Sequence, residues 1–315
     1  MRTIPLGHSG VEVSALCLGA MYFGTRTDPA TSLALLDQYV AAGGTFIDTA
    51  NIYTHWAEGG RGGESETLLG DWMKARRNRA DLFIASKVGF EYPGVERGLS
   101  ARLIEAECDK SLRRLGVEAI DLYYAHVDDR RTPLDETLAA FDRLVRAGKV
   151  RFVGASNYTA WRLEEARAVS AAGGYPAFCG VQQRYTYLRP RPGASFDPQL
   201  AANDDLLDYC RARRSEIALL AYSPLLGGAY TRADRPLPGE YAGPDTNARL
   251  AALREVAAAH GATPNQIVLA WMLHSDPVVV PVFAASSPAQ MAENLAALDI
   301  ALTPGQMAQL DGASG

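Results

Sequence analysis

Short apolar runs alternate with amphipathic segments along most of the chain. We interpret the apolar runs as β-strands, at 15–20, 45–48, 82–87, 120–125, 150–155, 178–182, 216–221 and 278–282. The segments between and after them have the pattern of helices, near 31–42, 64–76, 100–115, 133–147, 159–170, 199–213, 246–260 and 288–297. This regular alternation predicts an α/β fold, a closed (α/β)8 TIM barrel, in preference to an open sheet.

Two segments interrupt the alternation. Residues 3–13 have the pattern of a β-hairpin that turns at His8-Ser9-Gly10, and we expect it to close the bottom of the barrel. The Gly/Pro-rich stretch 223–244 follows the seventh strand and is too long for a simple βα loop, which favours a functional role. The sequence contains no internal repeat and no obvious linker, so we predict one domain over residues 1–315.

Polar side chains of four kinds stand where predicted strands end. Asp48 ends the run 45–48 and Tyr53 follows it, Lys87 ends the run 82–87, and His126 follows the run 120–125. The carboxyl ends of the strands of a parallel barrel open onto one face, so we expect these side chains to converge there. A carboxylate, a phenol, an ammonium and an imidazole at one mouth predict a proton-transfer site.

Composition and net charge restrict the kinds of partner that the protein is expected to bind. The chain has 315 residues, is 48% hydrophobic and carries a net charge of −5, without a block of five like charges. This balance argues against nucleic acid or an anionic membrane as the main partner. The N-terminus lacks a signal-peptide pattern and no apolar run approaches membrane-spanning length, so we expect a cytoplasmic protein.

Cysteines and histidines show no metal-binding pattern. The four cysteines (Cys17, Cys108, Cys179 and Cys210) form no Cys-x-x-Cys pair, and we interpret them as reduced, mostly core residues. The histidines outside the predicted site (His8, His55, His260 and His274) fit no metal-ligand spacing. We therefore expect no metal site.

Several motifs occur in a characteristic order: Leu16–Met21, Asp48–Tyr53, Ser86-Lys87, His126, Thr132-Pro133 through Gly148–Arg151, Gly154–Asn157, Val181-Gln182, Tyr222–Leu225 and Glu293-Asn294. With these motifs in register, the chain resembles the aldo-keto reductase family over essentially its whole length. The resemblance implies an (α/β)8 barrel, a nicotinamide cofactor bound without a Rossmann fold, and reversible reduction of a carbonyl. Consistently, no Gly-x-Gly-x-x-Gly follows a predicted strand.

The resemblance also implies roles for the four polar residues. Tyr53 would be the general acid/base, Lys87 would lower the pKa of its phenol, Asp48 would keep Lys87 charged, and His126 would orient the substrate carbonyl. Taken singly, a buried tyrosine, Lys–Asp pair or histidine is more often structural than catalytic. The joint pattern favours the catalytic interpretation.

Residues for the cofactor follow from the same resemblance. It implies that Ser156, Asn157 and Gln182 bind the nicotinamide carboxamide and that Tyr222 stacks on the nicotinamide ring, with Asp48 beside it. Ser223, Pro224, Leu225 and Gly227 would begin a loop over the pyrophosphate. Gly19, Ala20 and Met21 would touch cofactor or substrate, and Glu293 and Asn294 would hold the adenine.

One departure concerns the choice between NADPH and NADH. Family members that prefer NADPH usually have a lysine or arginine after the eighth strand, whereas residues 282–294 contain neither. Ser286 and Gln290 could contact the 2′-phosphate or a ribose hydroxyl, but neutral groups form weaker hydrogen bonds to phosphate than cations do. We therefore expect NADPH with NADH also usable, unless Arg232 or Arg235 reaches the phosphate.

The substrate is the least constrained partner. We expect a small carbonyl compound in a pocket formed by Tyr53, His126, Met21 and Trp56, with Trp56 on the glycine-rich loop 54–63. Arginines in loops 127–131 and 184–198 could recognise a sugar-like or anionic substrate or could simply be solvated. Two alternatives remain: a polyol or sugar dehydrogenase working in the oxidative direction, and a cofactor-binding regulatory protein. The oligomeric state stays open.

Overall fold

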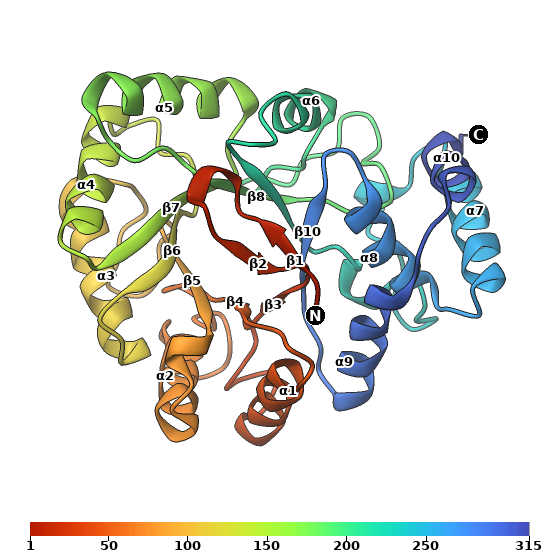
Figure 1. Cartoon of the computed structure of the whole chain (residues 1–315), viewed down its shortest axis with the longest axis horizontal. Helices are drawn as coiled ribbons and strands as arrows, with labels where there is room; N and C mark the ends of the chain where they lie inside the picture. The colour runs from red at the N-terminus through yellow and green to blue at the C-terminus, as the bar shows by residue number, and fades with distance from the viewer. Residues whose placement is uncertain (315) are drawn as a thin grey trace.

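Eight parallel strands close into a barrel in the computed structural model, which describes residues 1–314 (Figure 1). They are β3 (Cys17–Gly19), β4 (Phe46–Asp48), β5 (Phe83–Val88), β6 (Ile120–Ala125), β7 (Val150–Ser156), β8 (Gly180–Arg184), β9 (Ala218–Tyr222) and β10 (Val279–Phe283). Each pairs with the next along the chain, and β10 pairs with both β9 and β3 to close the ring. The predicted (α/β)8 barrel is confirmed.

Helices surround this barrel (Figure 1). They are α1 (Pro29–Ala41), α2 (Glu64–Arg76), α3 (Ala101–Leu115), α4 (Leu134–Arg146), α5 (Ala160–Gly173), α6 (Asp204–Ala212), α7 (Thr246–Ala259), α8 (Pro264–His274), α9 (Pro288–Leu295) and α10 (Pro304–Gly312). Helix α4 illustrates why they form: Leu134, Leu138, Phe141 and Leu144 recur on one helical face, and that face is buried.

The prediction was wrong about three helices. Neither α8 nor α10 was expected, and the helix predicted at 199–213 begins only at Asp204, after Asn203 caps it by accepting a hydrogen bond from the Leu206 amide at 3.0 Å. Helix α8 is buried on nearly every side, packed against α7 and β10. A helix without a polar face has no amphipathic stripe for a sequence pattern to reveal.

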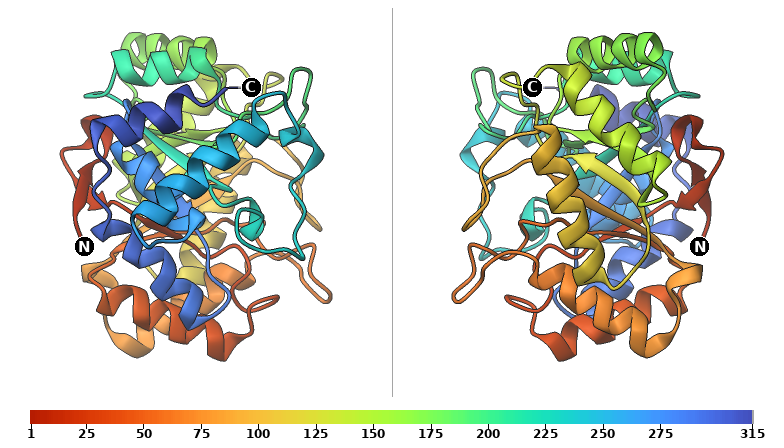
Figure 2. Two further views of the ribbon diagram at one scale, coloured as in Figure 1. Left: turned by 90° about the vertical axis from the view of Figure 1, so that its right-hand side faces the viewer. Right: turned by 90° about the vertical axis from the view of Figure 1, so that its left-hand side faces the viewer.

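The predicted N-terminal hairpin lies across one end of the barrel. Strands β1 (Thr3–Pro5) and β2 (Glu12–Ser14) pair antiparallel around a 3-10 turn at Gly7–Ser9. Leu6 and Val13 pack into an apolar cluster with residues that face the barrel interior, including Cys17, Phe46, Phe83, Leu122 and Leu220. Figure 2 shows the long loops at the opposite end, so the mouth formed by the carboxyl ends of the strands stays clear of the hairpin.

All four cysteines are free and buried, as expected for core thiols. Among residues 1–314, no helix has the length and apolar character needed to cross a lipid bilayer.

Candidate active site

The four predicted catalytic side chains converge at the carboxyl ends of β4, β5 and β6. Asp48 is the last residue of β4, Lys87 lies near the end of β5, and His126 directly follows β6. Tyr53 lies in the turn that continues from β4. Neighbouring strands in parallel register, with Asp48 beside Ala85 and Lys87 beside Tyr124, bring these positions to one level of the barrel.

The Lys87 ammonium is the centre of this group and has no exposed surface. It donates to the Asp48 carboxylate, to the Thr49 carbonyl at 2.8 Å and to the Tyr53 phenol oxygen at 2.8 Å. An ammonium has no further donor after these contacts. Because Lys87 donates to the phenol oxygen, that oxygen is the acceptor in this contact.

Burial dominates the protonation of these groups. It raises the pKa of Tyr53 well above its usual range, and the negative charge of Asp48 adds to the rise. Desolvation of the phenolate is therefore the largest effect on this pKa, and the predicted lowering by Lys87, which donates to the phenol oxygen, would act against it. Burial also lowers the pKa of Lys87, which the Asp48 carboxylate opposes.

His126 is held mainly by aromatic contacts. Its ring lies edge-on to Phe90 at 4.7 Å and to Tyr53 at 6.0 Å between centroids. Its Nδ1 atom is buried without a hydrogen-bond partner among residues 1–314. Burial, with the positive charge of Lys87, lowers the pKa of His126 well below its ordinary value. The imidazole is therefore neutral at physiological pH.

The side-chain amide of Asn157 forms more hydrogen bonds within the protein than the sequence suggested. Its amide nitrogen donates to the His126 carbonyl at 2.9 Å and to Ser156 Oγ at 3.2 Å. Its amide oxygen accepts from the Tyr222 hydroxyl at 2.7 Å and from the Leu200 amide at 3.0 Å. The backbone of Asn157 is left-handed, with φ of 60°, which asparagine tolerates better than most residues. This saturated amide joins four separate segments.

The other residues predicted near the nicotinamide also lie at the mouth. The Gln182 side chain donates to the second Asp48 oxygen at 2.8 Å and neighbours Ser156 across the β7–β8 pair. Tyr222 ends β9 half-buried, and the loop that follows is left-handed at Ser223, Leu226 and Gly227. Gly227 is exposed, and an added Cβ would meet nothing within 4 Å, so a ligand can approach its backbone closely.

The three residues predicted at the end of β3 differ in whether their side chains reach the mouth. Gly19 is buried, and a Cβ there would lie 3.2 Å from Val282 and 3.3 Å from the Phe283 carbonyl, so its glycine is needed for strand packing. Ala20 has no exposed surface. Met21 is half-buried and packs against the Tyr53 cluster. Of these three predicted contacts, Met21 is the one whose side chain reaches the mouth.

The predicted adenosine end contains no cation, and several of its side chains form hydrogen bonds within the protein. Gln290 Oε1 accepts from both the amide and the hydroxyl of the exposed Ser286, each at 2.9 Å. Glu293 accepts from Thr263 Oγ1 at 2.7 Å. The buried Asn294 donates to the Ala284 carbonyl at 3.2 Å. These side chains are neutral except Glu293.

The two arginines suggested for the 2′-phosphate are exposed on the loop after β9. The Arg232 guanidinium forms two hydrogen bonds to the Asp234 carboxylate, one of them at 3.0 Å. Arg235 has no ion pair within residues 1–314. Arg232 would have to leave its acid partner before it could contact a phosphate.

Sequence reasoning missed Glu107 of α3. This fully buried acid accepts, on one oxygen, from Asn51 Nδ2 at 2.7 Å and from the Tyr92 hydroxyl at 2.6 Å. Asn51 lies between Asp48 and Tyr53, and Tyr92 lies on the loop that carries Phe90. A detectable signal existed: Glu107 interrupts the apolar stripe that includes Ile104 and Cys108.

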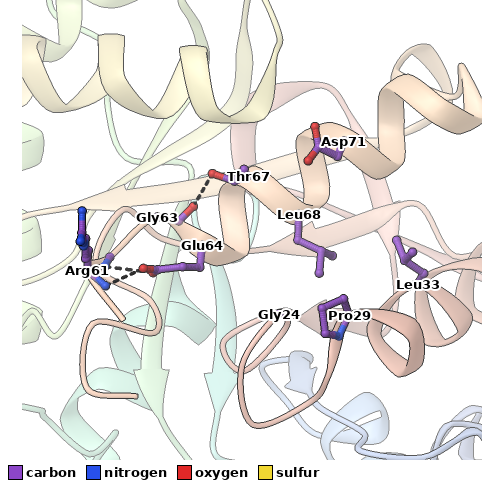
Figure 3. A pocket seen from close by; sticks show the side chains of 10 residues that line it. Gly24, Pro29, Leu33, Arg61, Gly63, Glu64, Thr67, Leu68 and Asp71 are labelled. Carbon is purple, nitrogen blue, oxygen red and sulfur yellow. Dashed lines mark hydrogen bonds between the residues drawn. The ribbon is translucent and has the colours of Figure 1, made fainter. Parts of the chain in front are cut away.

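Two hollows lie outside the four converging residues. One, of about 550 Å³, lies between the first turns of α1 and α2 (Figure 3). Its lining includes Leu33, Gly63, Thr67 and Leu68. The other, of about 1020 Å³, runs between the segment after β8 and helices α6, α8 and α10. Neither hollow is lined by Tyr53 or His126.

Comparisons with known proteins agree with this geometry. The model of the Aldo/keto reductase family matches residues 15–314. The uncharacterized oxidoreductase YrpG of Bacillus subtilis is 30% identical over 318 residues, covering 94% of this chain and 91% of that protein. The aldo-keto reductase str7 of Strobilurus tenacellus is 33% identical over 301 residues, covering 91% of this chain and 82% of that protein.

Two more relatives bear on function and fold. The norsolorinic acid reductase stcV of Emericella nidulans is 31% identical, covering 96% of this chain and 79% of that protein. The crystal structure of the thermostable aldo-keto reductase Tm1743 with the inhibitor epalrestat has 32% sequence identity and a TM-score of 0.78, with both chains fully covered. Sequence and structure comparisons therefore point to one family.

Proposed function

This chain belongs to the aldo/keto reductase family and is an oxidoreductase; from that premise we propose that it reduces an aldehyde or ketone to the alcohol with NADPH or NADH. The observation that carries the proposal is the buried Lys87 ammonium, bonded at once to Asp48 and Tyr53. In a barrel mouth, that arrangement suits the delivery of a proton to an oxygen on which negative charge develops.

Tyr53 is the proposed general acid. The raised pKa keeps its phenol protonated at neutral pH, so a proton is present when the carbonyl is reduced. After Tyr53 gives up that proton, the phenolate oxygen retains the Lys87 hydrogen bond at 2.8 Å, and that contact stabilises it. Asp48 keeps the ammonium charged although burial favours its neutral form.

His126 is the proposed orienting group for the carbonyl. A neutral imidazole can donate one hydrogen bond, and the ring is fixed by Phe90 and Tyr53 on its edges. A donor beside Tyr53 would hold the carbonyl oxygen toward the phenol and share the charge that develops there. Because the imidazole is neutral, Tyr53 is left as the proton source.

The residues present fit a nicotinamide cofactor. Ser156 Oγ and the Gln182 amide are neutral hydrogen-bonding groups that match a carboxamide, and Tyr222 offers a ring fixed by its hydroxyl on Asn157. The exposed backbone at Gly227 allows close approach of a pyrophosphate. When bound, the reduced nicotinamide supplies the hydride. Asn157 would position Tyr222 and His126 around the nicotinamide, because its side-chain amide is hydrogen-bonded to both residues.

At the adenosine end, Ser286 and Gln290 are the proposed contacts to the ribose or its 2′-phosphate. Asn294 would stabilise the segment after β10 through its hydrogen bond to the Ala284 carbonyl. Glu293 would contact the adenine while its carboxylate still accepts a hydrogen bond from Thr263. Without a cation in this segment, we propose modest preference for NADPH and ready use of NADH.

Cofactor titration followed by turnover tests the proposal. Full-length protein is titrated with NADPH and with NADH while protein fluorescence quenching is recorded, and then mixed with a nitrobenzaldehyde while oxidation of the cofactor is followed. We expect binding of both cofactors and reduction of the aldehyde. A folded sample that binds neither cofactor would contradict the proposal. Binding without turnover of activated carbonyls would instead favour a regulatory protein.

A further inference from the structure

An apolar cluster separate from the main core surrounds the proposed acid. Ala50, Ile52 and Tyr53 form it, and Met21 and Phe90 pack against it from the neighbouring loops. The Trp56 ring lies 6.1 Å from the Tyr53 ring, edge-on, and is 40% exposed. The ring centroids of Phe90 and His126 lie 4.7 Å apart. Aromatic and thioether groups therefore flank both side chains proposed to contact the carbonyl.

These surroundings do not suit a sugar. The hydroxyl groups of a sugar lose hydrogen bonds to water on binding and need paired polar groups in exchange. Met21, Trp56 and Phe90 offer little besides the indole N–H of Trp56. A flat aromatic ring, in contrast, can pack edge-on or offset against the rings of Trp56 and Phe90.

Two arginines border this cluster without acidic partners. The Arg97 guanidinium lies 5.4 Å above the ring of Phe90, and that of Arg26 lies 4.9 Å above the ring of Tyr22, the residue after Met21. Neither forms an ion pair within residues 1–314, and both are exposed. Arg130, in loop 127–131, differs: it also covers an aromatic ring, Trp161 at 5.2 Å, but is paired with Asp128 at 3.1 Å.

We propose that the substrate is an aromatic aldehyde or ketone that carries an anionic group, such as a carboxylate, away from its carbonyl. The ring lies between Trp56 and Phe90, the carbonyl faces Tyr53 and His126, and the anion faces Arg97, with Arg26 adding positive potential from the other side of the mouth. This substrate class rests on the proposed carbonyl reduction. An arginine is suited to the anion because its planar guanidinium binds a carboxylate through two donors while stacking on an aromatic ring.

A pair of probes that differ only in charge tests the inference. The enzyme is assayed with 4-formylbenzoate and with its neutral methyl ester, in wild type, Arg97→Gln, Arg26→Gln and the double variant. We expect the double variant to raise KM for the carboxylate about tenfold, the lower range for a hydrogen bond to a charged group, with most of the effect from Arg97→Gln. The KM for the ester and kcat for both probes should stay within about twofold, because the arginines would contact only the anion.

Arg130→Gln is the matched control, because it removes an arginine that also stacks on a ring at this end of the barrel but already has an acid partner. It should leave the carboxylate-to-ester ratio unchanged. An unchanged ratio in the double variant, or a free aldose reduced as efficiently as either aromatic probe, would overturn the inference. Failure of wild type to reduce either probe would instead count against the proposed function.

Discussion

The two ends of the proposed cofactor site are built in opposite ways. At the proton-transfer end, Lys87 and Asp48 are buried charges whose positions are fixed by several hydrogen bonds. At the adenosine end, Ser286 is exposed and neutral, and its hydroxyl donates to the Gln290 side chain. Preorganised buried charges fix a chemical step, whereas exposed neutral groups only adjust affinity. Chemistry should thus be hard to alter in this protein, and coenzyme choice easy.

The largest expected effect follows from removing the proposed proton donor. Tyr53→Phe should lower kcat for reduction by about 10²–10⁴-fold, the range for a general acid, with little change in cofactor Kd. Tyr123→Phe in β6 is the control, because its buried hydroxyl has no hydrogen-bond partner among the described residues. Steady-state kinetics and fluorescence titration measure both quantities. A Tyr53→Phe enzyme with half of the wild-type kcat would show that another group is the acid.

Lys87→Met should damage both activity and stability. Its removal leaves the Asp48 carboxylate buried without its ion pair, which costs about 3–5 kcal/mol in the free energy of unfolding, and kcat should fall on the order of 10²-fold because the phenolate loses its stabilising cation. The double variant Asp48→Asn/Lys87→Met separates the two effects. Urea unfolding should show recovered stability in it, and activity should stay low. Recovered activity would contradict the role of Lys87.

Ser286→Arg should shift coenzyme preference at the exposed end. A charge-assisted bond to the 2′-phosphate is worth roughly 1.5–3 kcal/mol, so the NADPH-to-NADH affinity ratio should rise about 10- to 150-fold. Ser286→Gln, neutral and long, is the control and should change the ratio little. Values of Kd for both cofactors decide this. A wild-type ratio above about a thousandfold would mean that a cation, Arg235 first, already reaches the phosphate.

The smallest expected effect is in the pH profile. An ordinary histidine gains a proton as pH falls through about 6.5, but burial lowers the pKa of His126 well below that value, so its imidazole should stay neutral through this range. The kcat/KM for an uncharged aldehyde should therefore vary less than about twofold between roughly pH 6 and 8, since His126 stays neutral and the Tyr53 phenol stays protonated there. An inflection near neutrality that His126→Asn removes would show that the imidazole does titrate there.

The strand ends and the convergence of the polar side chains that follow them were predictable because both follow one rule. Apolar runs followed by Asp48, Lys87 and His126 mark the carboxyl ends of barrel strands, and closure of the barrel brings those ends together. Helix α8 was missed because burial on nearly all sides removes the polar face that reveals a helix.

The features of the site that the sequence did not predict depend on contacts between segments far apart in the chain. The Asn157 amide is saturated only because Tyr222 and Leu200 come to it from distant segments. The upward shift of the Tyr53 pKa comes from burial, which a sequence motif does not record. The role of Glu107 depends on its partners: the acid is fully buried and joins two loops through Asn51 and Tyr92, which the sequence alone does not bring together.

The shared oxygen of Glu107 bears on how this enzyme could be re-engineered. Loops at the mouth of a barrel are attractive modules for grafting, since the strands beneath them stay unchanged. Here the loop carrying Phe90 and Tyr92 and the segment carrying Tyr53 both donate hydrogen bonds to one carboxylate oxygen on α3. A foreign loop without a hydroxyl at the position of Tyr92 would leave Asn51 as the remaining donor to that oxygen and break the link between this loop and the segment that holds the proposed acid. A graft intended to change specificity should therefore carry its α3 counterpart with it, or rate will be lost along with the old substrate.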